Sequence, residues 1–377
     1  MIPRLLFDLT VTQPAGGSKR HGGGIYGEIV LKRIIERGLE VEVFYDSSLW
    51  LNPEIKQLLD HHGIISYDSS VNTLQNIVEE SNCDRVYTCG ENHEFRSLVF
   101  PYKFYTLHGM RELETPLDRY FYKYSYPLKT RIKFALKQLL EKRYRLKHIR
   151  RVDRMIETGT RFVVVSNHTA NSIKSYLSQY ASRDIPVFYS PSTICEEVSG
   201  RVRDDKYFLI VSGNRWEKNA LRAIMALDRA FSTEKLDGFT AVVTGAETKG
   251  IYKYKFINPD RFSFKGYVDD KELHRLYRDA YALIYPSLNE GFGYPPLEAM
   301  HYGVPVLASP YTSISEICGD AALYFNPLSV EEIMSRILMI TDDATHRDLS
   351  DSGYARYEIV KNRQMKDLDR LIDFIYD

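Results

Sequence analysis

The sequence predicts two α/β domains in series, each a doubly wound parallel sheet covered by helices. Short buried-strand patterns alternate with helical patterns along most of the chain, and this alternation is typical of a parallel sheet with helices on its faces. The length of 377 residues is about twice that of a usual domain, so two domains are expected. We expect the first domain over residues 1–195 and the second over residues 196–359.

The first domain opens with a βαβ pattern. Residues 5–9 form an apolar strand pattern, and a glycine-rich loop follows over residues 15–24. Residues 25–37 carry apolar side chains at helical spacing, and Gly38 stands where a helix often ends. Ligands of such sheets bind beyond the carboxyl ends of the strands, so the cleft between the two domains is the expected site.

Composition excludes several classes of protein. Hydrophobic residues make up 44% of the chain and charged residues 27%, as in soluble globular proteins, and no apolar run approaches the length of a membrane span. The cysteines Cys83, Cys89, Cys195 and Cys318 show no metal-type spacing and are expected to be free thiols in a reducing compartment. We therefore expect a cytoplasmic protein, at most peripheral to the inner face of a membrane.

Lysine plus arginine equals aspartate plus glutamate at 50 each, but the charge is unevenly distributed. Residues 119–154 hold thirteen basic and two acidic residues, next to an aromatic stretch at residues 120–126. A solvated helix would explain this segment without a partner, but contact with an anionic membrane surface is the interpretation that we favour. Nucleic acid is not expected, because no recognised binding motif accompanies the charge.

The densest chemical signal lies at residues 285–300, YPSLNEGFGYPPLEAM. A buried strand pattern ends at Tyr285, the glycines at 291 and 293 permit a tight turn, and the two following prolines suit the start of a helix. The amides that open a helix bind anions. Glu290 precedes this helix and Glu298 lies within it, where its carboxylate suits sugar hydroxyls better than phosphate.

These residues and their flanks resemble glycosyltransferase family 4, a retaining GT-B family. The resemblance rests on FKGYVDDKEL at 264–273, LYRDA at 276–280, the segment above, GVPV at 303–306 and SEICGDAA at 315–322. It implies two Rossmann-like domains facing a central cleft, with a helix at residues 360–377 packing back on the first domain. It also implies transfer of a hexose, mannose in the first instance, from a nucleoside diphosphate sugar.

The resemblance also implies roles for single residues. Glu298 would bind the donor ribose, and Lys218 would neutralise the departing phosphate. Glu290 and the backbone amides of the following turn would face the transferred sugar and the diphosphate. The residues of that turn are Gly291, Phe292, Gly293 and Tyr294.

Further positions match the family less directly. His108 matches a histidine at the sugar end of the cleft, and Gly23 and Gly24 match a loop that approaches donor and acceptor. Gly213 lies in the SGNRWEKN motif at 212–219 with Arg215, whose role is open because it stands only three residues before Lys218. The backbone near Tyr267 and Val268 would contact the nucleotide base.

The resemblance implies no obligatory metal, and Asp269 and Asp270 fit a helix cap better than a metal motif. GDP- and UDP-sugars both remain possible donors, and a glycan or lipid-linked molecule is the expected acceptor in cell-surface polysaccharide synthesis. A sugar-phosphate synthase or epimerase of the same fold is an alternative. So is a catalytically silent relative that binds a glycan or scaffolds an assembly.

Overall fold

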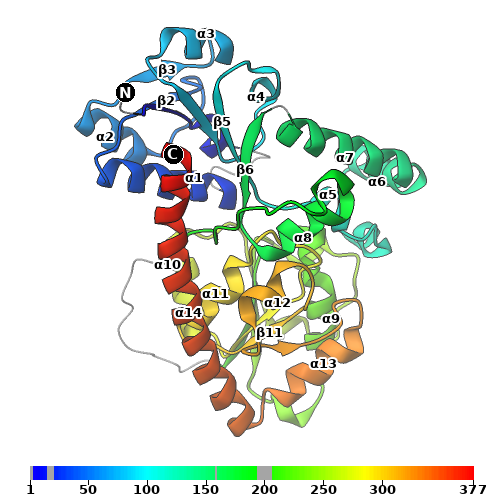
Figure 1. The fold of residues 1–377 in the computed structure, drawn as a ribbon. Coiled ribbons are helices and arrows are strands. Elements are labelled where there is room, and N and C mark those ends of the chain that lie inside the picture. Colours follow the sequence, from blue (N-terminus) through cyan, green and yellow to red (C-terminus); the bar gives the residue numbers. More distant parts are fainter. Residues whose placement is uncertain (1–2, 15–20, 158, 193–205) are drawn as a thin grey trace. The chain divides into compact units, whose positions relative to one another are not determined.

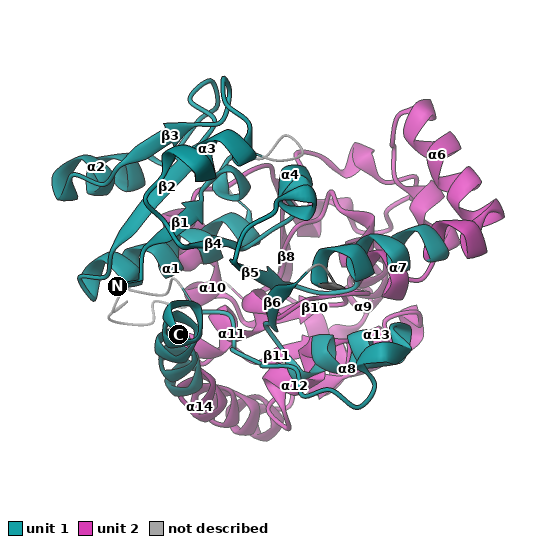
Figure 2. Cartoon of the chain, turned by 45° about the horizontal axis from the view of Figure 1, so that its top comes forward, with its two compact units in different colours: residues 1–110, 146–193, 361–377 teal, residues 111–145, 194–360 magenta. Residues whose placement is uncertain are grey.

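The computed structural model describes residues 3–14, 21–157, 159–192 and 206–377, and the chain divides into two compact units. Unit 1 comprises residues 1–110, 146–193 and 361–377, and unit 2 comprises residues 111–145 and 194–360 (Figure 2). Each unit is built around its own parallel six-stranded sheet (Figure 1).

The sheet of unit 1 has the strand order β3-β2-β1-β4-β5-β6. Its strands are β1 (Leu5–Asp8), β2 (Val41–Tyr45), β3 (Ser66–Asp68), β4 (Arg85–Thr88), β5 (Tyr102–Leu107) and β6 (Thr160–Val164). The helices that lie wholly in this unit are α1 (Gly22–Glu36), α2 (Pro53–His62), α3 (Leu74–Glu80), α4 (His93–Ser97) and α8 (Asn167–Tyr176). Every residue of β1 and β4 is buried, as expected for parallel strands with helices on both faces.

The sheet of unit 2 has the order β12-β11-β10-β7-β8-β9. Its strands are β7 (Tyr207–Ile210), β8 (Thr240–Thr244), β9 (Phe262–Lys265), β10 (Ala282–Tyr285), β11 (Val306–Ala308) and β12 (Leu323–Tyr324). Its helices are α5 (Arg111–Glu114), α6 (Leu128–Leu139), α9 (Ala220–Ala230), α10 (Asp270–Asp279), α11 (Tyr294–His301), α12 (Ser313–Cys318) and α13 (Val330–Met339).

Both sheets have the doubly wound order 3-2-1-4-5-6 when the strands of each unit are counted from its first. The order reverses between β1 and β4 in unit 1 and between β7 and β10 in unit 2. In open α/β sheets, ligands bind beyond the carboxyl ends of the strands at this reversal. The loops after β7 and β10 are therefore the expected position of a ligand in unit 2.

The division of the chain differs from the predicted one, because residues 111–145 fall in unit 2 rather than in the first domain. Tyr124 forms a β-bridge with Tyr252, and the Tyr126 hydroxyl donates to the carbonyl of Asn214 over 2.8 Å. Arg222 pairs with Asp118 over 2.6 Å, and both side chains are largely buried. The predicted boundary at residues 195 and 196 lies outside the described residues.

Two long helices cross the division between the units. Helix α7 (Glu141–Glu157) begins in unit 2, and α14 (Asp343–Tyr376) ends in unit 1 and starts well before the predicted residue 360. Within unit 1, the Asp367 carboxylate accepts from the amide of Tyr189 over 3.0 Å, and Arg33 pairs with Asp369 over 2.8 Å.

Candidate functional site

The reversal point of the second sheet carries a buried ion pair. Lys218 ends a short 3-10 helix (Trp216–Lys218) in the segment after β7, and Glu290 lies in the loop that follows β10. Lys218 Nζ is 2.5 Å from Glu290 Oε1, and each side chain is 8% exposed. Two charges that are distant in sequence therefore meet where the sheet topology places a ligand.

Two hydroxyls, one from the end of β10 and one from the loop after it, contact the carboxylate of Glu290. Tyr285, the last residue of β10, donates to Glu290 Oε1 over 2.5 Å and accepts from Lys218 Nζ over 3.1 Å. Ser287 donates to the same oxygen over 2.5 Å. Burial alone would raise the pKa of Glu290, but Lys218 and these hydrogen bonds outweigh burial and lower it. Burial lowers the pKa of Lys218, and Glu290 offsets part of that effect.

Helix α11 begins directly beyond this ion pair. Gly293 has φ +116°, a left-handed conformation that favours glycine, and prolines occupy the first turn of the helix. The Thr312 hydroxyl accepts from the amide of Glu290 over 2.9 Å, and the Ser313 hydroxyl donates to the carbonyls of Glu290 and Phe292 over 3.0 and 2.7 Å. The start of α12 therefore fixes the turn that the sequence predicts as the diphosphate site.

Glu298 lies one turn into α11, and its carboxylate interacts electrostatically with Lys218. Its carboxylate accepts a hydrogen bond from Tyr277 of α10, whose side chain is fully buried. Burial raises the pKa of Glu298 to about 7, although Tyr277 and Lys218 oppose that shift. The structure thus brings together Lys218, Glu290 and Glu298, with Phe292 and Gly293 on the connecting turn.

Two arginines add positive charge near Lys218. Arg215 Nη2 pairs with Glu217 over 2.7 Å and interacts electrostatically with Glu290. Arg111, at the start of α5, lies close enough to disfavour the charged form of Lys218. The sequence prediction missed Arg111, because its place beside Lys218 follows from the path of residues 111–145 and not from any local motif. It also missed Tyr285 and Ser287 as ligands of Glu290, although both lie in the YPS sequence before it.

The other predicted donor residues of unit 2 are Gly213, in the segment after β7, and Tyr267 and Val268, in the segment after β9. The amide of Gly213 donates to Thr244 and its carbonyl accepts from Tyr252, both over 2.7 Å. A Cβ at Gly213 would lie 2.8 Å from Val243, so close packing alone requires this glycine. Tyr267 is 76% exposed after β9, and Val268 is half-buried beside it.

The predicted glycine loop of unit 1 is, at residues 22–24, the first turn of α1, so the predicted helix start at residue 25 is wrong by three residues. His21 Nδ1 accepts from the amide of Gly24 over 3.1 Å and caps the helix. The prediction used the spacing of apolar residues, which does not show such a cap, and therefore placed the start of the helix too late. A Cβ on Gly24 would lie 3.0 Å from the carbonyl of Thr12, whereas Gly23 has more room. The part of the predicted loop at residues 15–20 lies outside the described residues.

His108 lies near these glycines, directly after β5. Its Nε2 donates to the carbonyl of Cys89 over 2.8 Å, and its ring meets that of Tyr26 edge to face at 4.7 Å. The thiol of Cys89 is 3.9 Å from the carbonyl of Gly23. Unit 1 therefore gathers Gly23, Gly24 and His108 at the carboxyl end of its own sheet.

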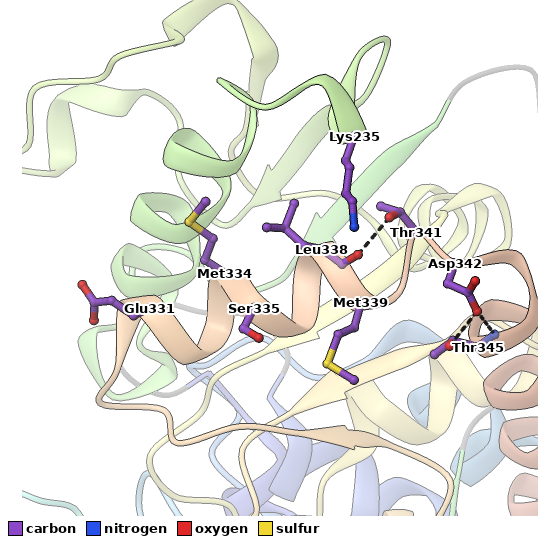
Figure 3. Close-up of a pocket in the computed structure, with 9 residues that line it drawn as sticks. All are labelled: Lys235, Glu331, Met334, Ser335, Leu338, Met339, Thr341, Asp342 and Thr345. Atoms are coloured by element: carbon purple, nitrogen blue, oxygen red, sulfur yellow. Dashed lines mark hydrogen bonds between the residues drawn. The ribbon is translucent and has the colours of Figure 1, made fainter.

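A separate pocket lies along α13 and the start of α14 (Figure 3). Lys235, Glu331, Met334 and Asp342 are among the residues that line it, and none of the predicted site residues does. No group of three or more histidine, cysteine, aspartate or glutamate side chains in the described part of the chain is placed to hold a metal ion.

The two parallel six-stranded sheets have the architecture of the GT-B glycosyltransferase fold, which consists of two Rossmann-like domains. Residues 194–356, which contain Lys218, Glu290 and Glu298, match the family model described as Glycosyl transferases group 1. This part of the chain is therefore similar to the glycosyltransferases of that family.

Similar sequences include several named mannosyltransferases. The O-antigen chain mannosyltransferase B of Escherichia coli is 45% identical over 87 residues, which cover 23% of this chain and 23% of that protein. The O-antigen chain mannosyltransferase RfbU of Salmonella typhimurium is 29% identical over 191 residues, covering 49% and 52% of the two chains. The matches thus span from about a quarter to about half of these two relatives.

Similar solved structures cover almost the whole chain. WaaG, a glycosyltransferase involved in lipopolysaccharide biosynthesis, has a TM-score of 0.65 at 16% identity over 97% of this chain and 98% of its own. HepE of Anabaena in complex with UDP-glucose also has a TM-score of 0.65, at 14% identity over 98% and 99% of the two chains. At these identities the similarity establishes the fold.

Proposed function

We propose that the protein transfers a hexose, mannose in the first instance, from a nucleoside diphosphate sugar to a glycan or lipid-linked acceptor, with retention of anomeric configuration. The observation that carries this proposal is the buried Lys218–Glu290 pair at the reversal point of the second sheet, directly before the start of α11. The names of the similar sequences favour mannose and cell-surface polysaccharide synthesis.

The proposed mechanism follows from the charge that develops during transfer. Cleavage of the anomeric bond increases negative charge on the diphosphate, and fixed positive groups stabilise that state more than the ground state. The Lys218 ammonium and the amides that open α11 are such groups, with Arg111 and Arg215 nearby. Because these groups supply the positive charge, we propose that transfer requires no bound metal.

We propose that Glu290 does not act as a nucleophile. One of its oxygens accepts from Lys218, Tyr285 and Ser287, and the side chain is almost entirely buried. We assign it the task of orienting Lys218 and facing the transferred sugar. Glu298 would accept hydrogen bonds from the donor ribose. In unit 1, His108 and the first turn of α1 would contact the sugar and the acceptor.

The cytoplasm is the proposed location, on the cytoplasmic face of a membrane where lipid-linked acceptors lie. Cys83, Cys89 and Cys318 are all free thiols, which fits a reducing compartment. Within the described residues, none of the helices has the length and hydropathy needed to span a bilayer.

The test is nucleotide release by the purified protein from GDP-mannose, with and without candidate glycan acceptors, and from UDP-glucose in parallel. We expect release to depend on acceptor and to be faster with GDP-mannose. Release at the same rate without acceptor would contradict transfer, and faster turnover of UDP-glucose would contradict the mannose assignment.

A further inference from the structure

Helix α6 turns its apolar face away from the protein. Leu128, Ile132, Leu136 and Leu139 are 71%, 51%, 50% and 79% exposed, and their spacing places them on one face of the helix. We call these four residues the leucine stripe. A surface helix normally buries such a stripe against the core, so four exposed members on one helix need an explanation.

The opposite face of α6 is anchored and prevents the helix from rolling inward. Phe134 is buried and stacks on Phe121 with ring centroids 3.7 Å apart, and its ring also meets Trp216 at 5.2 Å. Gln138 donates to the carbonyl of Leu117 over 3.0 Å and accepts from the Tyr122 hydroxyl over 2.8 Å. The leucine stripe is therefore held outward by contacts within unit 2.

The aromatic stretch at residues 120–126 makes many of its contacts within unit 2. Phe121 and Tyr124 are 3% and 2% exposed, and Tyr120 lies over the guanidinium of Arg222 at 3.5 Å. Phe121 and Tyr124 therefore pack inside unit 2, whereas Tyr120, Tyr122 and Tyr126 are half-buried. The exposed large apolar side chains of residues 119–154 are the leucine stripe, Leu140 and Leu146.

Positive charge borders the leucine stripe. Lys129 and Lys133 are exposed, and each follows a member of the stripe by one position, so both lie along one edge of it. Lys142 and Arg143 follow Glu141 in the first turn of α7. Helix α6 contains no acidic residue. Apolar side chains bordered by lysines are suited to the boundary between lipid headgroups and acyl chains, with the lysines directed to anionic headgroups.

We propose that α6 docks unit 2 on an anionic lipid bilayer, lying flat in the interface with the leucine stripe inserted. A second copy of the chain is a poorer occupant, because a twofold contact through the stripe would bring the lysines of both copies together. This surface goes beyond the proposed transfer reaction, since none of its residues belongs to the donor site.

The experiment is co-sedimentation of the full chain with vesicles of phosphatidylcholine alone or mixed with phosphatidylglycerol. We expect binding to the mixed vesicles that weakens with added salt, and much weaker binding to phosphatidylcholine alone. The variant L128S/L136S/L139S should bind the mixed vesicles at least about 30-fold more weakly. Removal of two charges in K129Q/K133Q should weaken binding about 10-fold or more.

Matched controls are available on the same protein. V71S/V99S/I257S changes three exposed apolar residues elsewhere, and K253Q/K255Q removes two exposed lysines of unit 2. Both control variants should bind mixed vesicles like the wild type. Thermal shift with GDP should be unchanged in the stripe variants, which shows that they fold and separates this test from that of the donor site.

Equal vesicle binding by the wild type and the stripe variant would overturn the proposal, as would absence of wild-type binding. Sedimentation of the wild type as a dimer that the stripe substitutions dissociate, without vesicle binding, would instead identify a second copy as the occupant. That result would also overturn it.

Discussion

Lys218 Nζ and Glu290 Oε1 form an ion pair with the two atoms 2.5 Å apart, and each side chain is 8% exposed. The pair joins the loops after β7 and β10, the two strands at which the order of the sheet reverses. Removing one member of a buried pair leaves an unpaired charge, whereas replacing both can be neutral. This asymmetry lets stability and activity be separated by mutation.

Lys218→Met is expected to lower the free energy of unfolding by about 3–5 kcal/mol, because Glu290 loses its buried partner. Turnover should fall at least about 100-fold as the departing diphosphate loses its cation. The double variant Lys218→Met/Glu290→Gln should recover most of the stability and none of the turnover. Urea denaturation and nucleotide-release assays measure the two effects, and near-normal turnover in either variant would exclude the assigned role of Lys218.

Tyr285→Phe removes a hydroxyl that contacts both members of the pair. We expect a loss of about 1–2 kcal/mol in stability. If the hydroxyl positions Lys218 and Glu290 for the reaction, kcat should fall about 10-fold or more while KM for the donor changes little. Tyr281→Phe is the matched control, because its hydroxyl donates to the carbonyl of Ile340 over 2.9 Å and should affect stability alone. Equal kcat values for the two variants would remove Tyr285 from the functional site.

Glu298 gives a pH-dependent prediction. Burial raises its pKa to about 7 from an ordinary value of 4.5, so between these values the folded state holds a proton that the unfolded state has released. Its contribution to stability therefore falls as pH rises through this window. Glu298→Gln should stabilise the nucleotide-free protein relative to wild type by about 1–3 kcal/mol at pH 8, and by less near pH 5.

The control for that measurement is Glu234→Gln, which changes an exposed glutamate of unit 2. Its stability difference from wild type should be the same at both pH values. Glu298→Gln should also weaken nucleotide binding at pH 8, since the amide accepts ribose hydroxyls less well than a carboxylate. A pH-independent difference between Glu298→Gln and wild type would contradict the assigned environment of this residue.

Gly293→Ala tests the turn that precedes α11. The Cβ would meet nothing within 4 Å, so the cost comes from the backbone at φ +116°, and we expect about 1–3 kcal/mol together with weaker nucleotide binding. Gly63→Ala is the comparison, because Gly63 also has open space and a positive φ of +62° at the end of α2. That variant should lose stability and keep its affinity for nucleotide. Unchanged nucleotide affinity in Gly293→Ala would argue against the turn as the binding element.

The sequence predicted the parallel sheets well because their strands are continuous apolar runs. The strand expected at residues 5–9 is observed at Leu5–Asp8, and the strand expected to end at Tyr285 ends there. It predicted Lys218, Glu290 and Glu298 through a motif, and the structure shows that they lie together. The unit to which residues 111–145 belong was not predictable, since the contact between Tyr124 and Tyr252 joins residues 128 positions apart. The outward face of α6 was missed because periodicity shows that a helix is amphipathic and not which face meets the core.

The most direct test of the central claim is a crystal structure of the protein soaked with GDP at a concentration that saturates it by calorimetry. The account predicts the diphosphate within hydrogen-bond distance of Lys218 Nζ and of the amides that open α11, with the ribose hydroxyls on Glu298. A nucleotide bound elsewhere, with Lys218 and Glu290 still paired and no phosphate beside them, would contradict it.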